Sequence, residues 1–598
     1  MPSLPNIRNS AIRVALALLI GFLFLLPHLV RMLDIGSISD YTPFAAQSPS
    51  PMTWDETFLY GPEANYMLQR HALAGDTDTW EHRNEPFPYS VLPITVEAGL
   101  AAVVGSLGAA QIICAFVFPA ITAWLLMGIF RQIGVSAPIS AALALLVLAV
   151  GFSTRTVPNN ILDLLRHGLH GGATDTMQAA RNPNPNMSFP LFLGAIVCLS
   201  SAIRRNSAAR LLVAGVLGGL LFYTYSYYAI AWTAAVAFLC AVALIRPLLV
   251  PPKLAITLAA TAILAVPFFE GSHLSRLSGG YQNRANRLGM VFGHLPSKSG
   301  IFLTIAWGAT ALIAWFVWTR ISLRLDPGAR SQTTTTFLVI LFCVIGGLAG
   351  MNMQLITGFN VQETHHFPHM ILQPLVLTLI CLIVATSLRK VKPWVGIAGF
   401  TALYLVCVAA QVEGAASTAF AHQMPESDKA LFNWLNANTE QGAVVATTDL
   451  RLATILPLYT HDSTLMANGS RTSATNEELI ERYLLANKLI QAPTLTVQSK
   501  LSQGLGAGSP LPVMTYSEFL FEAAPQKDAI RWSLTPEATE QAIQQYQQID
   551  PSTELLRLRV DYIWLSSGTP LEIRGYAWKK VFDNSAGSLW QIVANQQN

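Results

Sequence analysis

The feature that most constrains this chain is a series of apolar runs, each about as long as a bilayer-crossing helix. A helix needs about 20 mostly apolar residues to cross the hydrocarbon core, and such runs recur through the first two thirds of the sequence. The sequence therefore predicts an all-α polytopic membrane bundle with about eleven transmembrane helices. The predicted spans lie near 12–31, 109–130, 137–153, 187–203, 208–224, 228–246, 254–269, 300–319, 334–351, 368–387 and 393–412.

Charge supports this class and divides the chain in two. Charged residues make up 12% of the sequence, whereas soluble domains carry roughly 25%. The charges are sparse up to about residue 413 and frequent afterwards. We therefore predict a transmembrane domain at 1–412, with a long first outer loop at 32–90, and a soluble domain at 413–598.

Basic residues in the loops predict the orientation. The segment 91–107 is apolar but carries Glu97, and it fits either a span or an amphipathic helix on the membrane surface. Lysine and arginine in short loops favour the cytoplasm. With 91–107 on the surface and Glu97 at the interface, twelve basic residues lie in the loops of one side, and seven lie in the opposite loops 154–186 and 271–299. This count favours eleven spans, a cytoplasmic N-terminus and an extracytoplasmic C-terminal domain.

The C-terminal domain has alternating helix and strand patterns, which predict an α/β fold. An amphipathic helix begins at Ser427, and Thr475 with Glu478 forms a capping box ahead of a second helix. Residues 444–448, 560–565 and 589–593 have strand-like patterns. No nucleotide-binding loop or metal-ligand spacing is present in this part of the sequence, so a structural or acceptor-positioning role is expected.

The first outer loop carries two adjacent carboxylates, Asp55 and Glu56, with aromatic residues on both sides. A carboxylate at the membrane face can act as a general base towards a hydroxyl group, or it can hold a divalent cation through oxygen. The alternative is structural, with Asp55 capping the helix that follows and Glu56 solvated. Neither the presence nor the identity of a metal follows from the residues.

Arginines in the predicted outer loops are the second group of candidate site residues. They stand out because arginine in short loops favours the cytoplasmic side. Guanidinium groups match phosphate oxygens in a bidentate manner, and a lipid-phosphate leaving group needs such donors. The alternative is that these arginines bind lipid head groups or pair with nearby carboxylates. The candidates for donor-phosphate binding are Arg155, Arg181, Arg276, Arg284 and Arg287.

Histidines at the outer mouth of the ninth and tenth spans form the third set. His365 and His366 lie in a stretch that also carries Glu363 and His369. Pro368 disfavours the regular helix that a metal-binding pair at i, i+4 needs. We interpret His365 and His366 as hydrogen-bond donors to a phosphate or sugar, with simple interfacial histidines or a metal site as the alternatives.

Taken together, these features resemble the GT-C superfamily of polyprenyl-phosphate-dependent glycosyltransferases. The resemblance rests on an N-terminal span, a long outer loop opening with Asp55 and Glu56, a proline-led return to the membrane and a many-span bundle ending in an outer α/β domain. The superfamily includes protein O-mannosyltransferases, aminoarabinose transferases and oligosaccharyltransferase catalytic subunits. The sequence lacks the Trp-Trp-Asp motif of oligosaccharyltransferases and the Lys-Pro-Pro motif of aminoarabinose transferases. The resemblance therefore does not imply which donor and which acceptor this chain uses.

The resemblance implies an integral membrane enzyme, expected in the bacterial inner (plasma) membrane as part of cell-envelope synthesis. It implies sugar transfer from a lipid-linked donor to a glycan, glycolipid or protein acceptor on the outer face. Asp55 and Glu56 would be the catalytic carboxylates, and a divalent cation at Asp55 is one option for a cofactor. The alternatives are a multi-span transporter or flippase and a non-catalytic envelope assembly protein. No nucleic-acid partner is expected.

Overall fold

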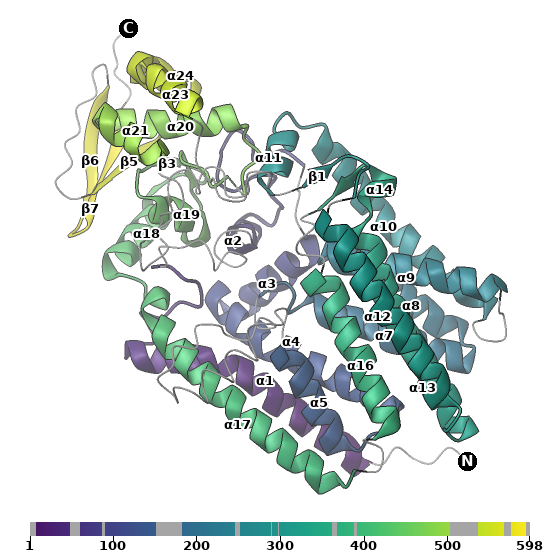
Figure 1. The fold of residues 1–598 in the computed structure, drawn as a ribbon. Coiled ribbons are helices and arrows are strands. Elements are labelled where there is room, and N and C mark those ends of the chain that lie inside the picture. Colours follow the sequence, from purple (N-terminus) through teal and green to yellow (C-terminus); the bar gives the residue numbers. More distant parts are fainter. Residues whose placement is uncertain are drawn as a thin grey trace.

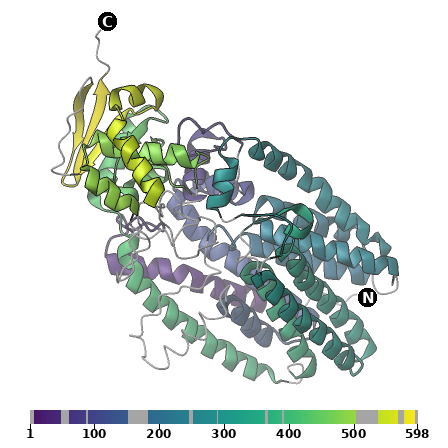
Figure 2. The same cartoon turned by 45° about the horizontal axis from the view of Figure 1, so that its top comes forward.

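The computed structural model places most of the described chain in helices (Figure 1). A five-stranded sheet lies near the C-terminus, and β1 (Val291–Phe292) pairs with β2 (Phe359–Asn360) elsewhere. Long helices form the larger part of the molecule, and the sheet lies at the end away from the N-terminus. Figure 2 shows the same arrangement from another direction. The structure describes residues 7–47, 60–86, 90–150, 182–245, 251–288, 290–296, 298–361, 367–387, 391–469, 471–502, 536–566 and 576–593.

A helix occurs at each predicted span, and eight described helices are long and apolar enough to cross a membrane. Those eight are α1 (Ile7–Ile35), α4 (Leu107–Gln132), α7 (Ser188–Arg205), α9 (Ser226–Ile245), α10 (Ala255–Arg276), α12 (Lys298–Ser322), α13 (Pro327–Met351) and α17 (Pro393–Thr418). Three predicted spans correspond to shorter helices, namely α5 (Ala137–Val150), α8 (Ala208–Leu220) and α16 (Gln373–Thr386). The membrane-helix bundle is thus confirmed, and the count of eleven crossings stays a prediction.

Small residues bring neighbouring helices into close contact. A Cβ at Gly215 of α8 would lie 2.6 Å from the Thr257 carbonyl oxygen of α10, and one at Gly219 would lie 2.6 Å from the Leu264 Cβ. The Thr261 hydroxyl donates to the Gly215 carbonyl at 3.1 Å. Glycines spaced four residues apart allow such close backbone approach between apolar helices.

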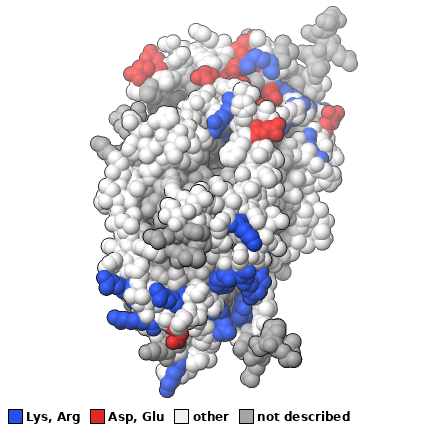
Figure 3. Space-filling view, turned by 90° about the vertical axis from the view of Figure 1, so that its right-hand side faces the viewer, with Lys and Arg blue, Asp and Glu red and all other residues white. Residues whose placement is uncertain are grey.

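Basic residues gather at one end of the helical bundle. On the face in Figure 3, lysines and arginines cluster at one end, a broad uncharged zone follows, and residues of both signs lie at the other end. Two hydrogen bonds join three helix ends at the basic side, because Arg204 of α7 donates to Thr336 of α13, whose hydroxyl donates to Gln132 of α4. The predicted same-side loops after α4 and α7 therefore lie together.

The C-terminal sheet has five strands in the order β4-β3-β5-β7-β6. Strand β3 pairs in parallel with β4 and β5, and the remaining pairs are antiparallel. The predicted strands at 444–448, 560–565 and 589–593 correspond to β3, β5 and β7. The strands are β3 (Val444–Ala446), β4 (Ser463–Thr464), β5 (Tyr562–Ser566), β6 (Ala577–Asp583) and β7 (Gly587–Val593).

Six described helices accompany the sheet: α18 (Glu426–Asn438), α19 (Leu450–Tyr459), α20 (Asn476–Leu489), α21 (Thr494–Ser502), α23 (Pro536–Gln548) and α24 (Pro551–Arg557). The predicted capping box is confirmed, because the Thr475 hydroxyl accepts from the Glu478 amide and the Glu478 carboxylate accepts from the Thr475 amide. Helix α17 runs across residue 412, so the division into 1–412 and 413–598 stays a prediction.

The first outer loop packs against this C-terminal region. Helix α2 (Gly61–Arg70) begins with Pro62 at its first turn, a position where proline is pre-shaped for a helix. Asn65 of α2 donates to the carbonyls of Pro457 and Thr460 at 3.1 and 2.8 Å. The loop after α2 reaches β4, because the Thr464 amide donates to the Asp78 carbonyl at 2.8 Å.

Candidate functional site

The predicted catalytic pair, Asp55 and Glu56, lies outside the described residues, and the described chain resumes at Tyr60. Tyr60 is buried, with 7% of its surface exposed. Its hydroxyl accepts a hydrogen bond from the Asn184 side chain at 3.2 Å. Because Asp55 precedes Tyr60 by five residues, its Cα lies within about 18 Å of the Tyr60 Cα. Tyr60 is the described residue nearest in sequence to the predicted pair.

Three buried asparagines just before α7, which we term the asparagine cluster, lie beside Tyr60. Asn182 donates to the Gln111 carbonyl at 3.0 Å, and Asn184 donates to the Thr224 carbonyl at 3.1 Å. Asn186 donates to the Cys114 carbonyl at 3.2 Å. The cluster thus joins α4, α7 and the turn before α9. The Oδ1 atom of Asn184 is buried and has no hydrogen-bond partner.

Glu97 extends this polar region on α3 (Val91–Val104). It is fully buried, and its Oε1 accepts from the Gln111 side chain at 2.8 Å. The expectation that Glu97 reaches the membrane interface is therefore wrong, because α3 packs against α2 and α4 and encloses the carboxyl group. The sequence signal was a single acidic residue within an otherwise apolar helix.

An apolar groove borders the asparagine cluster. It encloses about 260 Å³ between α3, α4, α7 and α8. Thr224 lines the groove, and its carbonyl is the group that accepts from Asn184. The apolar groove therefore meets the polar cluster at one point. It is lined by Leu92, Pro93, Val96, Phe118, Ile121, Met187, Pro190, Leu191, Leu217 and Thr224.

Arg287, one of the predicted phosphate ligands, is fully buried on α11 (Tyr281–Arg287). Its guanidinium group donates to the carbonyls of Gly469, Thr472 and Ala474 at 2.6, 3.0 and 2.8 Å, and to Asn476 Oδ1 at 2.7 Å. A guanidinium group has five N–H donors, so these partners use most of its capacity. Arg287 holds α11 against the C-terminal region, and its role towards a phosphate stays a prediction.

Arg284 and Arg276 differ in environment. Arg284 is buried, with 5% of its surface exposed, and donates to the Ser473 hydroxyl at 3.4 Å. Arg276 is exposed at the end of α10, and its guanidinium group lies 4.4 Å from the centre of the Phe359 ring. Stacking leaves the N–H groups at the guanidinium edge accessible. Arg276 is thus the described candidate with most capacity for a phosphate, whereas Arg155, Arg181, His365 and His366 lie outside the described residues.

Sequence reasoning missed two buried carboxylates in the first outer loop. Asp76 accepts five hydrogen bonds, from the amides of Asp78, Thr79 and Ser473 and the hydroxyls of Thr79 and Thr472. Asp78 forms an ion pair with Arg471 at 2.8 Å, and both side chains are fully buried. Burying a charge is costly unless it is paired and hydrogen-bonded. These carboxylates therefore lock the first outer loop onto the C-terminal region.

Glu63 is a third buried carboxylate in this loop, and it lacks such partners. It is 1% exposed, and neither of its carboxylate oxygens has a hydrogen-bond partner. Burial raises the pKa of Glu63 well above its ordinary value, and the neighbouring Asp76 adds to this effect, while Arg284 and Arg471 oppose it. Glu63 lies one helical turn after Tyr60.

No group of three or more His, Cys, Asp or Glu side chains that could hold a metal ion occurs within the part of the chain that the structure describes. That part leaves out Asp55, Glu56, His365 and His366. The divalent cation considered for Asp55 therefore stays a prediction.

Comparison with known proteins finds similarity among solved structures. No family model matches the sequence, and no curated protein matches it. Among solved structures, the chain is similar to the crystal structure of ArnT from Cupriavidus metallidurans in the apo state. The two share 13% identity, the match covers 80% of this chain and 94% of that chain, and the TM-score is 0.32. At this identity and TM-score, residues of the two chains are not equated.

Proposed function

We propose that this protein is a membrane glycosyltransferase that moves a sugar from a polyprenyl-phosphate donor to an acceptor on the outer face. The observation that carries the proposal is the meeting of the apolar groove with the asparagine cluster at Thr224. A lipid-linked sugar has an apolar chain and a polar head, and a site for it needs both surfaces side by side. Apolar pockets with a few convergent polar groups are typical of ligand sites.

The groove suits a polyprenyl chain because its lining is almost wholly apolar and it lies among helices of the membrane bundle. Ile121 lines the groove and is 40% exposed at the helix surface. A lipid chain would therefore enter from the bilayer without crossing a polar layer. The polar head would then lie towards Asn184 and Tyr60.

Asp55 is the proposed base, and Glu56 its neighbour. General-base catalysis needs the carboxylate within hydrogen-bonding reach of the acceptor hydroxyl. The chain length between Asp55 and Tyr60 permits this near the asparagine cluster. Asp55 would take the proton of the acceptor hydroxyl while the oxygen of that hydroxyl attacks the anomeric carbon of the donor sugar. The lipid phosphate leaves with the bonding electrons.

Arg276 is the proposed stabiliser of the leaving phosphate, because its stacked guanidinium group is exposed. His365 and His366 are proposed as further donors. Charge-assisted hydrogen bonds to phosphate are the strong ones among side-chain contacts. Arg155, Arg181 and Arg284 remain candidates for the same role, whereas Arg287 is largely engaged with the C-terminal region.

The proposed orientation places the basic end of the bundle in the cytoplasm. The gathering of lysines and arginines at one end supports it (Figure 3), since cytoplasmic loops carry an excess of these residues. The first outer loop and the C-terminal sheet would then face the outside of a bacterial inner membrane. The acceptor would be a glycan, glycolipid or protein of the cell envelope.

The test of this function is sugar transfer by the full chain in lipid nanodiscs, with radiolabelled polyprenyl-phosphate sugars and envelope extracts as acceptors. We expect Asp55→Asn to reduce transfer by roughly a hundredfold or more, because loss of a general base typically costs that much. Thermal unfolding of the variant should match that of the parent chain.

Glu440→Gln is the matched control, since Glu440 is an exposed carboxylate in the C-terminal region. It should transfer sugar at the parent rate. Full transfer by the Asp55→Asn variant would exclude Asp55 as the base. Absence of transfer from every polyprenyl-linked sugar, with a folded parent protein, would contradict the function itself.

A further inference from the structure

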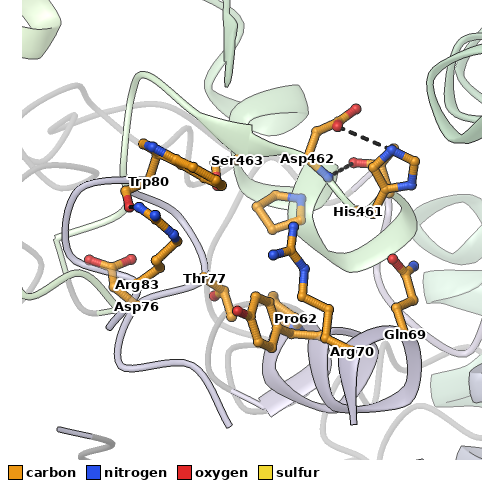
Figure 4. Close-up of a pocket in the computed structure, with 13 residues that line it drawn as sticks. Pro62, Gln69, Arg70, Asp76, Thr77, Trp80, Arg83, His461, Asp462 and Ser463 are labelled. Atoms are coloured by element: carbon orange, nitrogen blue, oxygen red, sulfur yellow. Dashed lines mark hydrogen bonds and ion pairs between the residues drawn. The ribbon is translucent and has the colours of Figure 1, made fainter. Parts of the chain in front are cut away.

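A cleft distinct from the apolar groove lies between the first outer loop and the C-terminal region. We term it the α2 cleft. One wall is formed by α2 and the loop after it, and the other by the segment from Pro457 to Ser463. Its enclosed part holds about 20 Å³, which is room for one or two water-sized groups. Figure 4 shows Arg70 extending from α2 towards the segment that carries His461 and Asp462, with Trp80 and Arg83 to one side.

Arg70 is held in place, and its charge acts on Asp462 and His461 across the cleft. Its guanidinium group lies over the Tyr66 ring at 4.9 Å. On the described residues it forms no hydrogen bond or ion pair. A Cβ at Gly442 would lie 2.8 Å from its Nη2 atom, so the Gly442 backbone also confines it. A fixed, partly buried guanidinium group without a partner is a ready donor for an anionic oxygen.

Thr77 is the second unpaired group in the cleft. It is 6% exposed and lines the cleft, and its hydroxyl has no hydrogen-bond partner among the residues that the structure describes. A buried polar atom without a partner costs about 1–3 kcal/mol, and such a group in a native structure calls for an explanation. A ligand atom that contacts both Thr77 and Arg70 would supply one.

The remaining polar groups suit the hydroxyls of a sugar. Asp462 is fully buried, and its carboxylate accepts from the Thr439 hydroxyl at 3.0 Å. Burial raises the pKa of Asp462 to about 7. Both Asp462 oxygens lie 3.0 Å from the Thr439 hydroxyl, and the carboxylate also accepts from the Ala443 backbone. Each carboxylate oxygen has two lone pairs, so one remains to accept from a ligand hydroxyl. Asp76, which also lines the cleft, already accepts five hydrogen bonds and is unsuited to this role.

The charges in the cleft indicate the chemical class of the ligand. Arg83 is the second guanidinium group in the cleft, and it lies 3.4 Å from the centre of the Trp80 ring. Burial lowers the pKa of His461, which keeps it neutral at pH 7. The cleft therefore offers two fixed positive groups, one free hydroxyl and one carboxylate that accepts hydroxyl protons.

From these contacts we propose that the enclosed part of the α2 cleft receives the anionic group, a carboxylate or a phosphate, of a saccharide whose ring lies at the open side of the cleft. Arg70 and Thr77 hold the anionic oxygens, and Asp462 accepts from a sugar hydroxyl. The cleft lies apart from the apolar groove and has no apolar channel of its own for a lipid chain. If the proposed glycosyl transfer holds, on which this last step rests, the saccharide bound here belongs to the acceptor.

The test is direct binding to the full chain in nanodiscs, without donor and without turnover. Isothermal titration would compare glucuronate, glucose 6-phosphate, glucose and inorganic phosphate. We expect glucuronate or glucose 6-phosphate to bind at least tenfold more tightly than glucose and than inorganic phosphate. The two acidic sugars distinguish a carboxylate from a phosphate ligand.

Arg70→Gln should weaken acidic-sugar binding roughly ten- to hundredfold, the effect of one lost charge-assisted hydrogen-bonding partner. Thr77→Val keeps the side-chain shape and should weaken it several-fold, which preserves the test if the first variant unfolds. Arg557→Gln is the matched control, because Arg557 lies outside the cleft, 50% exposed and paired with Glu481. It should bind as the parent does.

Equal affinity for glucose and glucuronate, unchanged binding in both cleft variants, or inorganic phosphate binding as tightly as the acidic sugars would overturn the proposal. The Asp55→Asn variant separates this claim from the proposed function. It should bind the acidic sugar as tightly as the parent chain, whatever its transfer activity.

Discussion

At the scale of single residues, the first outer loop carries three buried carboxylates with different surroundings. Asp76 accepts five hydrogen bonds and Asp78 is ion-paired with Arg471, whereas Glu63 has no hydrogen-bond partner among the described residues. A carboxyl group that burial holds neutral contributes most stability at low pH. That contribution falls as pH rises above the pKa of the group in the unfolded chain, near 4.3, towards its raised pKa in the folded protein. Glu63 should therefore lower the stability of the protein increasingly between pH 5 and pH 8.

Glu63→Gln tests this dependence, because glutamine has nearly the same shape and carries no charge. The variant should unfold at a higher temperature than the parent, and the difference should grow from pH 5 to pH 8. Thermal unfolding in nanodiscs across that range measures it. Glu440→Gln should show no such growth. A difference that shrinks with rising pH would mean that Glu63 is ionised and paired in the folded protein.

Sequence alone did not reveal these carboxylates, and the reason is physical. Two of the five donors to Asp76, from Thr472 and Ser473, and the Arg471 partner of Asp78 lie almost 400 positions away in the chain. Neither local pattern nor composition predicts such long-range partners. By contrast, Asp55 and Glu56 stood out because they are adjacent and flanked by aromatic residues. The candidate site was thus predicted by its local motif, whereas its supporting network was not.

At the scale of elements, the predicted spans, helices α18 and α20, and strands β3, β5 and β7 followed from local patterns, whereas β4 and β6 were not predicted. The capping box at Thr475 set the start of α20, and the apolar runs set the spans. The exception was the segment 91–107. Its sequence fits a span or a surface helix equally well, and the structure forms a helix whose Glu97 is enclosed by α4. Only packing against neighbouring elements distinguishes these cases.

The contact between α8 and α10 gives a prediction at this scale. Gly215→Leu would place a side chain where the Thr257 carbonyl and the Ala260 Cβ now lie within 2.7 Å of a Cβ. Overpacking of this kind costs about 1–3 kcal/mol. We expect a lower unfolding temperature in detergent and a smaller monodisperse fraction after heating.

Gly308→Leu on α12 is the control, since a Cβ at Gly308 has no neighbouring atom within 4 Å. It should behave as the parent chain does. Equal stability of the two variants would mean that α8 and α10 do not pack as closely as the structure has them.

At the scale of the whole molecule, the account depends on sidedness. The basic helix ends lie at one end of the bundle, and the first outer loop and the sheet lie at the other. The apolar groove would then hold the lipid chain of the donor, and the asparagine cluster would contact the polar head of the donor. Both would lie near the face where Asp55 is proposed to act. If the loop faced the cytoplasm, the proposed acceptors of the cell envelope would be out of reach.

Thiol labelling of intact spheroplasts measures this directly. Ala72→Cys adds an exposed thiol to the first outer loop, and Gly328→Cys adds one at the start of α13, while the native cysteines are buried or half-buried. With a membrane-impermeant maleimide, we expect Ala72→Cys to react in intact spheroplasts and Gly328→Cys to react only after permeabilisation. The reverse pattern would place the first outer loop in the cytoplasm and contradict the account.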